Sequence, residues 1–593
     1  MTRTITAVTA ALLFSIAAGS APALAADAGA PEMTAPPQTV PDILSSKQKA
    51  SYKQVLAAIR GQRWAEAKTL LDGADQDAKG APLSDFLRAE LLLAAGSPRA
   101  EVADIMPLLA RAPWLPQADR LGRLAAKRGA TDLPTLPPQT RLAWAGSAPR
   151  RVGADSVNDP VAASLARTIP DRIKNDDPAG AEALLNAVID QLSPDARAEW
   201  TQKVAWSYYI ENDDANALRL ALSCASGHNG WATQGAWVQG LAAWRLRDYR
   251  TALVAFDRVG REAPDSELRA AGYYWAARAA IASGEPASVQ QRLRAAAANE
   301  ETLYGLLAAE TLGIETGSQR ENVRADRSAW RALEDLPNVR VAMAFAEIDE
   351  DQYAGDALKH QARIGNPGQH GQLIGMAQAL SLPETQLYLA HNTPGGRKLA
   401  AAARYPQPKW EPNGGWKVDP ALVFAHTLQE SRFQRAVVSP AGAYGLMQVL
   451  PGTARDVARW RGEAVATTDL RIPAVNMDFG QSYLQYLSRD ASTGGLLPKV
   501  IAAYNAGPAP VARWATEVRD NGDPLLFMES IPYWETRGYV GIVLRNYWMY
   551  EAQQGKPSVS RAALAQGQWP RFPDGKDRVR LTHAAPTGLA SAN

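Results

Sequence analysis

The sequence predicts an all-α protein, in which a superhelical solenoid of helical pairs precedes a smaller helical domain. From Ser46 to about Glu310, Ala, Leu, Arg and Glu dominate at helical period. Clusters of Gly, Pro or Asp-Asn break this pattern about every ten to fifteen residues, which is typical of short paired helices. A single core stops growing at roughly 250 to 300 residues, so the 593 residues of the chain predict two or three domains.

The N-terminus has the pattern of a secretory signal peptide, residues 1–25. Arg3 is followed by an apolar run from Ala7 to Ala18, and Ala23-Leu24-Ala25 is a typical cleavage site. We therefore expect cleavage after Ala25 and export to the periplasm. Residues 26–45, rich in Ala, Pro and small polar residues, predict a flexible lead-in. No later stretch approaches the ~20 apolar residues of a transmembrane segment.

Charge and cysteine content exclude several classes of protein. The formal net charge is +2, whereas nucleic-acid-binding proteins usually concentrate a basic excess, so no nucleic-acid partner is expected. The chain has one cysteine, Cys224. This excludes an internal disulfide and a metal site built from cysteines. The fold must therefore depend on a packed core.

The predicted solenoid covers residues 46–392. Residues 63–67, 212–215 and 247–252 have the composition of a turn followed by the start of a second helix. Around Gly240 and Phe256 the spacing resembles a degenerate tetratricopeptide repeat. Such pairs must stack, because one pair cannot bury its apolar face alone. A Pro-rich interruption at 112–160 is not expected to be helical throughout and is predicted to contain an extended or irregular crossing segment.

Proline and glycine mark the later boundaries. The sequence from Thr393 to Gly415 contains PGG and YPQPKWEPNGG and predicts a linker. A second helical domain is expected at 416–552, followed by a polar C-terminal tail at 553–593. Trp569 and Phe572 indicate that part of this tail docks on the folded protein.

Glu430 is the single carboxylate between Asp419 and Asp456. Pro420 suits the first turn of a helix, and helical spacing gives a core-facing stripe of Ala421, Phe424, Ala425 and Leu428. At about 100° per residue, Glu430 points away from this stripe and shares its side with Val423, His426 and Thr427. Burial against such a wall raises the pKa of a carboxyl group, as a general acid near neutral pH requires.

The residues after Glu430 form a longer pattern. Ser439 to Gln448 predicts a turn-rich loop, in which Gly442 and Gly445 adopt positive φ or let another segment approach closely. A second helix is expected from Pro451. Three ordered motifs resemble soluble lytic transglycosylases: Glu430-Ser431-x-Phe433 with Ser439 and Gly442-Ala443-x-Gly445-Leu446-Met447-Gln448, then Ala503-Tyr504-Asn505-Ala506-Gly507, then Ile531-Pro532-x-x-Glu535-Thr536-Arg537-x-Tyr539-Val540.

The resemblance implies a lysozyme-like α domain and a reaction on peptidoglycan. In this family one acid protonates the β-1,4 oxygen between N-acetylmuramic acid and N-acetylglucosamine. The same group then takes the proton of the C6 hydroxyl, which closes a 1,6-anhydro ring. Glu430 would be this acid and base, and the N-acetyl group at C2 would supply the first attack. The resemblance implies no metal and no cofactor.

Other matching residues are implied to bind substrate: Ser439, Gln448, Leu450, Tyr504, Asn505 and Glu535. Ser439 would hydrogen-bond near the departing or the acetamido group, and Gln448 would line the sugar site. Tyr504 would steady the intermediate or orient Glu430. Glu535 would bind substrate or tune Glu430. Leu450 stands where some relatives have Met, which leaves a hydrophobic wall but no thioether.

Several of these residues also have a structural interpretation. Ser439 precedes Pro440 and could cap a turn. Tyr504 and Asn505 could be a core aromatic residue and a helix C-cap. Glu535 could pair with Arg537 at a helix start. His426 is interpreted as a packed core histidine, because the family pattern has no partner acid or base there.

Two alternative functions stay open. A muramidase of the goose-type lysozyme kind would use the same acid with water as acceptor and would need a second carboxylate. A non-catalytic scaffold would bind peptidoglycan with the C-terminal domain and hold other cell-wall enzymes with its solenoid. The intact Glu430 favours an enzyme over the scaffold.

Overall fold

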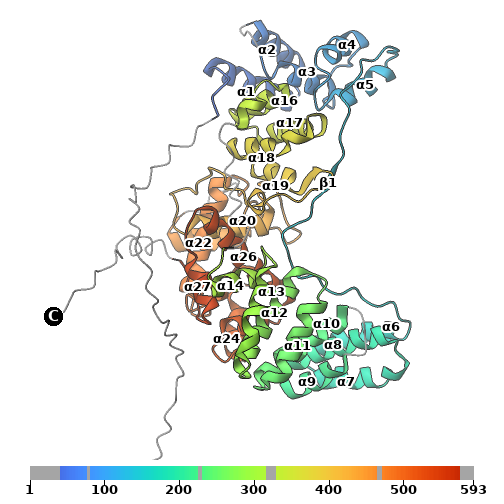
Figure 1. Ribbon diagram of the computed structural model, residues 1–593. Helices are drawn as coiled ribbons and strands as arrows, with labels where there is room; N and C mark the ends of the chain where they lie inside the picture. The colour runs from blue at the N-terminus through green and yellow to red at the C-terminus, as the bar shows by residue number, and fades with distance from the viewer. Residues whose placement is uncertain (1–39, 77–80, 225–229, 316–328, 464–469, 574–593) are drawn as a thin grey trace, which may run out of the picture. The chain divides into compact units, whose positions relative to one another are not determined.

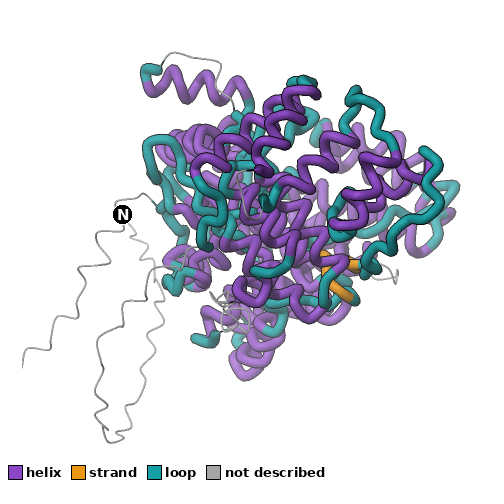
Figure 2. The backbone as a smooth tube through the Cα atoms, turned by 90° about the horizontal axis from the view of Figure 1, so that it is seen from above, coloured by secondary structure: helices purple, strands orange, loops and turns teal. Residues whose placement is uncertain are grey.

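Short helices make up most of the chain, as the periodicity predicts. The computed structural model describes residues 40–76, 81–224, 230–315, 329–463 and 470–573. Within these ranges the regular structure is helical apart from two short strands (Figure 2). The predicted all-α fold class is therefore confirmed. The predicted signal peptide and residues 26–39 of the lead-in lie outside the described residues.

The N-terminal helices pack in sequential pairs (Figure 1). They are α1 (Ser46–Arg60), α2 (Trp64–Gln76), α3 (Ser84–Leu93), α4 (Val102–Arg111) and α5 (Ala118–Lys127). Residues 40–45 precede α1, and there Leu44 is buried while Ile43 donates its N–H to Glu347 at 2.7 Å. The end of the predicted lead-in is thus fixed to the fold.

A second series of helices follows the Pro-rich segment. It comprises α6 (Ala162–Lys174), α7 (Pro178–Asn186), η1 (Ile189–Gln191), α8 (Pro194–Ile210), α9 (Asp214–Ser223), α10 (Gly230–Arg245), α11 (Tyr249–Glu262), α12 (Ser266–Ala282), η3 (Pro286–Ser288), α13 (Val289–Ala297) and α14 (Leu303–Leu312). Asn212 and Arg247 have positive φ of 62° and 63°. The next residues, Asp213 and Asp248, cap the following helices. The turns predicted at 212–215 and 247–252 are confirmed.

The third series continues into the predicted linker, 393–415, where its last two elements lie. It consists of η4 (Ala329–Leu333), α16 (Pro337–Ala346), α17 (Asp351–Ile364), η5 (Pro367–Gln369), α18 (His370–Ala379), α19 (Pro383–His391), β2 (Asn392–Pro394) and η6 (Ala401–Arg404). Strand β1 (Leu142–Trp144) lies in the Pro-rich segment and pairs antiparallel with β2, with Ala143 opposite Thr393. Part of the predicted crossing segment is thus extended.

The C-terminal helices carry the motifs. They are α20 (Pro420–Ser431), α21 (Pro451–Arg461), α22 (Pro473–Arg489), α23 (Leu497–Ala506), α24 (Pro508–Glu517), α25 (Pro524–Glu529), α26 (Trp534–Gln553) and α27 (Val559–Ala565). Helix α26 packs against both α20 and α23. It therefore brings the third motif next to the first two.

Buried apolar side chains form two clusters. One combines residues between 44 and 125 with residues between 333 and 403. The other combines residues between 162 and 309 with the C-terminal helices. Leu303 and Tyr304 of α14 belong to the same cluster as Val540 and Val543 of α26. The helices that carry the motifs thus share a hydrophobic core with the second helical series.

The described part of the tail contacts the folded protein. Trp569 Nε1 donates to the Gly522 carbonyl oxygen at 2.9 Å, and the Phe572 N–H donates to the Gly495 carbonyl oxygen at 2.9 Å. The docking predicted from Trp569 and Phe572 is confirmed. Among the described residues, none of the helices is both long enough and apolar enough to cross a membrane.

Candidate active site

Helix α20 places Glu430 in its last turn. The Asp419 side chain accepts a hydrogen bond from the Ala421 N–H at 2.9 Å, and Pro420 occupies the first turn, as predicted. The helix ends after Ser431, because Arg432 and Phe433 have positive φ of 52° and 64°. Glu430 therefore lies where the chain turns away from the helix.

The loop after α20 is built as its glycines predict. Gly442 and Gly445 have φ of 78° and 68°. A Cβ on Gly445 would lie 2.3 Å from the Leu470 carbonyl oxygen, so no other residue fits there. Buried Asn476 accepts from the Met447 N–H at 2.7 Å and donates to the Tyr444 carbonyl oxygen at 2.8 Å. The loop is therefore fixed against α22.

Glu430 is half-buried and, within the described residues, accepts one hydrogen bond. Tyr539 Oη on α26 donates to Glu430 Oε1 at 2.5 Å. Burial raises the pKa of Glu430 to about 7, and the nearby charge of Glu535 acts in the same direction, while the hydrogen bond from Tyr539 opposes both. A carboxyl group with this pKa holds its proton in about half of the molecules at neutral pH, which suits a general acid.

Aromatic rings form one wall beside Glu430. The ring of His426 lies 4.9 Å from that of Tyr504 and 6.1 Å from that of Tyr539, between centroids. His426 is fully buried, its Nδ1 donates to the Leu422 carbonyl oxygen at 2.9 Å, and burial lowers its pKa to about 4. His426 is thus a neutral core residue, as predicted.

Two of the predicted substrate-binding residues also hold the loop together. Ser439 Oγ accepts from the Ala443 N–H at 3.0 Å, which is the turn cap of the structural interpretation, and its hydroxyl proton stays available. Gln448 Nε2 donates to the Gly445 carbonyl oxygen at 2.8 Å. The amide oxygen of Gln448 is the atom left to meet a ligand.

Tyr504 and Asn505 connect helices. Tyr504 Oη donates to the Met447 carbonyl oxygen at 2.8 Å, so the hydroxyl that contacts Glu430 belongs to Tyr539 and not to Tyr504. The charge of Glu430 nevertheless contributes to raising the pKa of Tyr504, which burial raises most. Asn505 Oδ1 accepts from Thr536 Oγ1 at 2.6 Å and so ties α23 to α26.

Leu450 and Glu535 are exposed. Leu450 precedes α21 and is 43% exposed, as a wall of an open site would be. Glu535 lies in the first turn of α26, and its charge acts to raise the pKa of Glu430. No ion pair joins Glu535 to Arg537 in the described chain, where Arg537 donates to the Ile531 carbonyl oxygen at 2.9 Å.

Tyr539 contacts Glu430, although the sequence did not single it out. It belongs to the third motif, yet no role was assigned to it. It stands 109 positions from Glu430, so helical spacing cannot relate the two residues. The available signal was the motif itself, because a tyrosine one turn after Glu535 on the same helix faces the same side.

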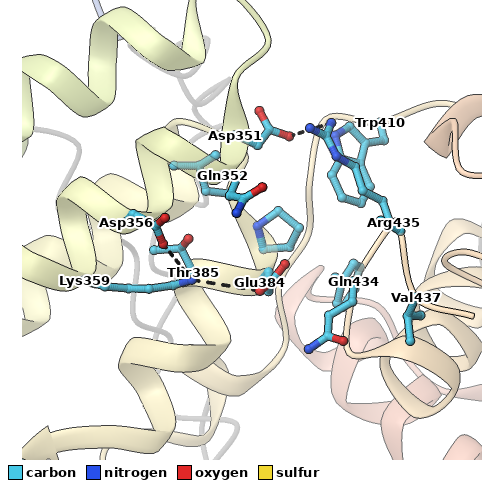
Figure 3. Close-up of a pocket in the computed structure, with 14 residues that line it drawn as sticks. Asp351, Gln352, Asp356, Lys359, Glu384, Thr385, Trp410, Gln434, Arg435 and Val437 are labelled. Carbon is cyan, nitrogen blue, oxygen red and sulfur yellow. Dashed lines mark ion pairs between the residues drawn. The ribbon is translucent and has the colours of Figure 1, made fainter. Parts of the chain in front are cut away.

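Two cavities flank this region. One of about 310 Å³ is lined by Gln429, Glu535 and Tyr539, together with Arg151 and Arg537. The other, of about 450 Å³, lies between the segment that follows α20 and the helices α17 and α19 (Figure 3).

Its lining includes Arg435 and Asp351, which form an ion pair at 3.1 Å. None of the predicted site residues lines this second cavity. The first cavity adjoins the candidate site through Glu535 and Tyr539, whereas Glu430 itself does not line it.

A comparison with known families agrees with the motifs. Residues 411–527 match the family described as Transglycosylase SLT domain. The soluble lytic murein transglycosylase of Salmonella typhimurium is 35% identical over 163 residues, which are 26% of this chain and 24% of that protein. The enzyme of the same name from Escherichia coli K12 is 36% identical over 151 residues, 25% of this chain and 23% of that protein.

The chain thus spans about a quarter of the length of these curated relatives. The resemblance predicted from the motifs is confirmed over this region.

A solved structure extends the likeness to the whole fold. The crystal structure of the 70 kDa soluble lytic transglycosylase of Escherichia coli superposes with a TM-score of 0.54 at 18% identity. The superposition covers 89% of this chain and 100% of that chain. At this identity the likeness shows a shared, mainly helical fold.

Proposed function

We propose that the protein is a peptidoglycan lytic transglycosylase, with residues 416–552 as its catalytic domain. It would cleave the β-1,4 bond between N-acetylmuramic acid and N-acetylglucosamine and leave a 1,6-anhydromuramic end. The observation that carries the proposal is the state of Glu430: a half-buried carboxyl group with a pKa raised to about 7, held by one tyrosine hydroxyl.

The first step uses the proton of Glu430. The carboxyl group gives its proton to the glycosidic oxygen as the bond from that oxygen to C1 of the muramic acid breaks. The carbonyl oxygen of the N-acetyl group at C2 forms a bond to C1 and so stabilises the positive charge that develops there. The N-acetylglucosamine side leaves as a neutral alcohol, and Glu430 is left as a carboxylate.

The second step returns the proton. The C6 hydroxyl attacks C1, the bond from the acetamido oxygen to C1 breaks, and the Glu430 carboxylate takes the hydroxyl proton. The products are the 1,6-anhydro ring and the original protonated Glu430, so no water is consumed. The Tyr539 hydroxyl stabilises the carboxylate between the two steps, because it donates a hydrogen bond to the charged form.

The other site residues have supporting roles in this proposal. Ser439 and Gln448 each keep one polar atom for the acetamido group or the sugar hydroxyls. Tyr504 forms the wall behind the reacting sugar, and Leu450 forms an apolar edge. Asn505 holds α26 in place through Thr536. Glu535 keeps the pKa of Glu430 high through its charge.

Hydrolysis is the competing reaction at the same site. A muramidase would need a carboxylate that activates water, and Glu535 is the acid whose charge reaches Glu430. Mass spectrometry of the soluble products from purified sacculi separates the two reactions. Anhydromuramic ends are the result we expect, and reducing muramic ends would overturn the proposal in favour of hydrolysis.

A scaffold without catalysis is disfavoured by the same carboxyl group. A site that only binds glycan gains nothing from a half-buried acid, whose desolvation costs free energy whenever it ionises. In this case purified protein would bind sacculi and release no soluble products. We expect release, and Glu430→Gln provides the matched non-catalytic control.

The location and partners follow from the proposed substrate. The pattern of residues 1–25 supports export to the periplasm, where peptidoglycan lies. N-terminal sequencing of the exported protein is expected to begin at Ala26. The solenoid offers helical surfaces that bind other proteins in repeat folds. We predict that other cell-wall enzymes bind there, and co-purification after cross-linking tests this.

A further inference from the structure

Four aromatic rings form a continuous row from the candidate active site to the surface. Tyr504 lies 5.5 Å from Tyr483, Tyr483 lies 6.2 Å from Tyr486, and Tyr486 lies 6.0 Å from Trp460, between ring centroids. The planes of Tyr483 and Tyr486 differ by only 9°. We call Tyr504, Tyr483, Tyr486 and Trp460 the aromatic row.

The outer half of this row is open to solvent. Tyr486 is 41% exposed and Trp460 is 45% exposed. In the described chain the large aromatic side chains with comparable exposure are few: Trp144, Trp460, Tyr486, Tyr533 and Trp534. All but Trp144 belong to the C-terminal domain that contains Glu430. An exposed aromatic patch beside a candidate active site indicates a ligand-binding surface.

Packing alone explains only part of the arrangement. Tyr483 and Tyr486 are three residues apart on α22, so their rings meet as helical neighbours, and Trp460 of α21 packs against the same helix. Aromatic residues that serve only the core are covered: Trp275 contacts three aromatic neighbours and is 0% exposed. The row leaves two large rings in water, which packing does not require.

The inner end of the row is adjacent to Glu430. The charge of Glu430 contributes to the raised pKa of Tyr504, and the ring of Tyr504 contacts that of His426 on the helix that carries Glu430. A ligand that reaches Glu430 therefore already lies at the start of the row. A chain that continues from there over α22 meets Tyr486 and then Trp460.

The chemistry of the row fits sugar rings. A pyranose has an apolar face of C–H bonds and a rim of hydroxyl groups, and C–H groups are attracted to the negative face of an aromatic ring. Arg489 lies over one face of the outer ring, with its guanidinium carbon 5.7 Å from the centroid of Trp460, and leaves the other face for a sugar. Its N–H groups can donate to hydroxyl or acetamido oxygens at the rim of a stacked sugar.

We propose that Tyr486 and Trp460 form an accessory subsite that binds sugar rings of the glycan strand beyond the two sugars at the cleaved bond. This inference rests on the proposed function for the identity of the glycan. Its consequence is a preference for long strands, because short oligosaccharides that fill the centre of the site do not reach the outer rings.

Binding measurements with oligosaccharides of defined length test this subsite. The probes are β-1,4-linked N-acetylglucosamine oligomers of increasing length, titrated into full-length protein carrying Glu430→Gln so that no cleavage occurs. Isothermal calorimetry gives the affinity for each length. We expect affinity to rise with length, and Trp460→Ala or Tyr486→Ala to lower the affinity for the longest oligomer by about 3- to 10-fold.

Three further variants serve as controls. Trp460→Phe keeps a ring at the outer position and is expected to retain most of the affinity. Trp144→Ala removes an aromatic side chain that is 58% exposed on β1 and is expected to change nothing. Arg489→Ala keeps both rings and is expected to lower the affinity less than Trp460→Ala does. Equal thermal midpoints show that the variants are folded.

The length dependence decides the outcome. Loss of affinity confined to long oligomers supports the subsite, whereas equal loss at every length, or no loss at any length, overturns it. The reaction type is tested separately, because binding is measured without turnover. If the wild-type enzyme released reducing ends from sacculi, the transglycosylase proposal would fall while a length-dependent loss would still establish the subsite.

Discussion

Glu301 in the solenoid and Glu430 at the candidate active site are carboxyl groups with different hydrogen-bond partners. Glu301 is 3% exposed, and its carboxylate forms a two-point ion pair with Arg404, whose Nη2 lies 2.5 Å from Glu301 Oε2. Glu430 is held instead by the neutral hydroxyl of Tyr539. An arginine stabilises the charged form of an acid, whereas burial beside a tyrosine leaves the protonated form competitive at neutral pH.

The same contrast recurs across the described structure. Asp214 pairs with Arg245 at side-chain exposures of 1% each, and Glu529 pairs with Arg151 at 2.6 Å. For Glu430, no lysine, arginine or histidine lies within ion-pair distance in the part of the chain that the structure describes. Glu301 and Asp214 of the solenoid and Glu529 of α25 are thus paired with cations, and Glu430 is not.

A raised pKa alone does not identify the site. Burial also raises the pKa of Glu267 and of Glu551 to about 7. Both residues are buried, at 9% and 6% exposed, and Glu267, which lines the cavity of about 310 Å³, accepts a hydrogen bond from the Leu303 N–H at 2.9 Å. Glu430 combines a raised pKa with partial exposure and a neighbouring row of aromatic rings. Accessibility therefore separates the candidate catalytic acid from buried structural acids.

The largest expected effect is on turnover when the proton of Glu430 is removed. Glu430→Gln keeps the shape and the hydrogen bond from Tyr539 but cannot donate or accept the catalytic proton. We expect release of soluble products from sacculi to fall by about 10²- to 10⁴-fold. Oligosaccharide binding is expected to persist. Solubilisation of sacculi at the wild-type rate by this variant would reject Glu430 as the acid.

At the buried ion pair of Arg404 and Glu301, we expect a loss of stability without a loss of turnover. Arg404→Ala leaves the carboxylate of Glu301 without its cation and is expected to lower the free energy of unfolding by about 3–5 kcal/mol. Chemical denaturation measures this change. Turnover per folded molecule is expected to stay near that of the wild type, because Arg404 does not touch the candidate site.

The matched control is an exposed pair. Arg459 and Asp456 are 77% and 72% exposed and lie 3.0 Å apart. Arg459→Ala is expected to cost less than about 1 kcal/mol, because water and salt screen such pairs. If Arg404→Ala and Arg459→Ala lowered the free energy of unfolding equally, a buried arginine would not stabilise its carboxylate more than an exposed arginine does.

A smaller effect is expected from Tyr539→Phe. The hydroxyl of Tyr539 lowers the pKa of Glu430, so its removal raises this pKa further. Glu430 must be protonated to act as the acid, so kcat/KM falls as pH rises through its pKa. The alkaline limb of the profile is therefore expected to move to higher pH, by about one unit. A shift to lower pH would contradict the hydrogen bond.

The smallest effect is expected from Glu535→Gln. The charge of Glu535 raises the pKa of Glu430, so its loss lowers this pKa and moves the alkaline limb to lower pH. Because Glu535 is exposed, we expect less than about half a unit, and less still at high salt. If Glu535 were instead the base of a hydrolase, the variant would lose most of its activity at every pH.

Local rules account for what the sequence could predict. Pro420 and Asp419 begin α20, Gly442 and Gly445 shape the loop, and the turns before α9 and α11 follow from nearby residues. Each of these features depends on positions a few residues apart. The motifs then indicated Glu430 and the order of the three segments around it.

Contacts across the sequence could not be predicted in the same way. The hydrogen bond from Tyr539 to Glu430, the one from Thr536 to Asn505 and the division of the helices between two hydrophobic cores depend on how α26 packs against α20 and α23. No period in the sequence encodes this packing. For the same reason the sequence, which predicts that Tyr504 steadies the intermediate or orients Glu430, did not indicate that its hydroxyl bonds to the Met447 carbonyl oxygen.

The central claim is that Glu430 holds its proton near neutral pH while remaining accessible to substrate. Infrared difference spectroscopy of the wild type against Glu430→Gln isolates the band of this one protonated carboxyl group as pH is varied. We predict that the band disappears with a midpoint near pH 7. A midpoint near the ordinary value of 4.5 would contradict the account.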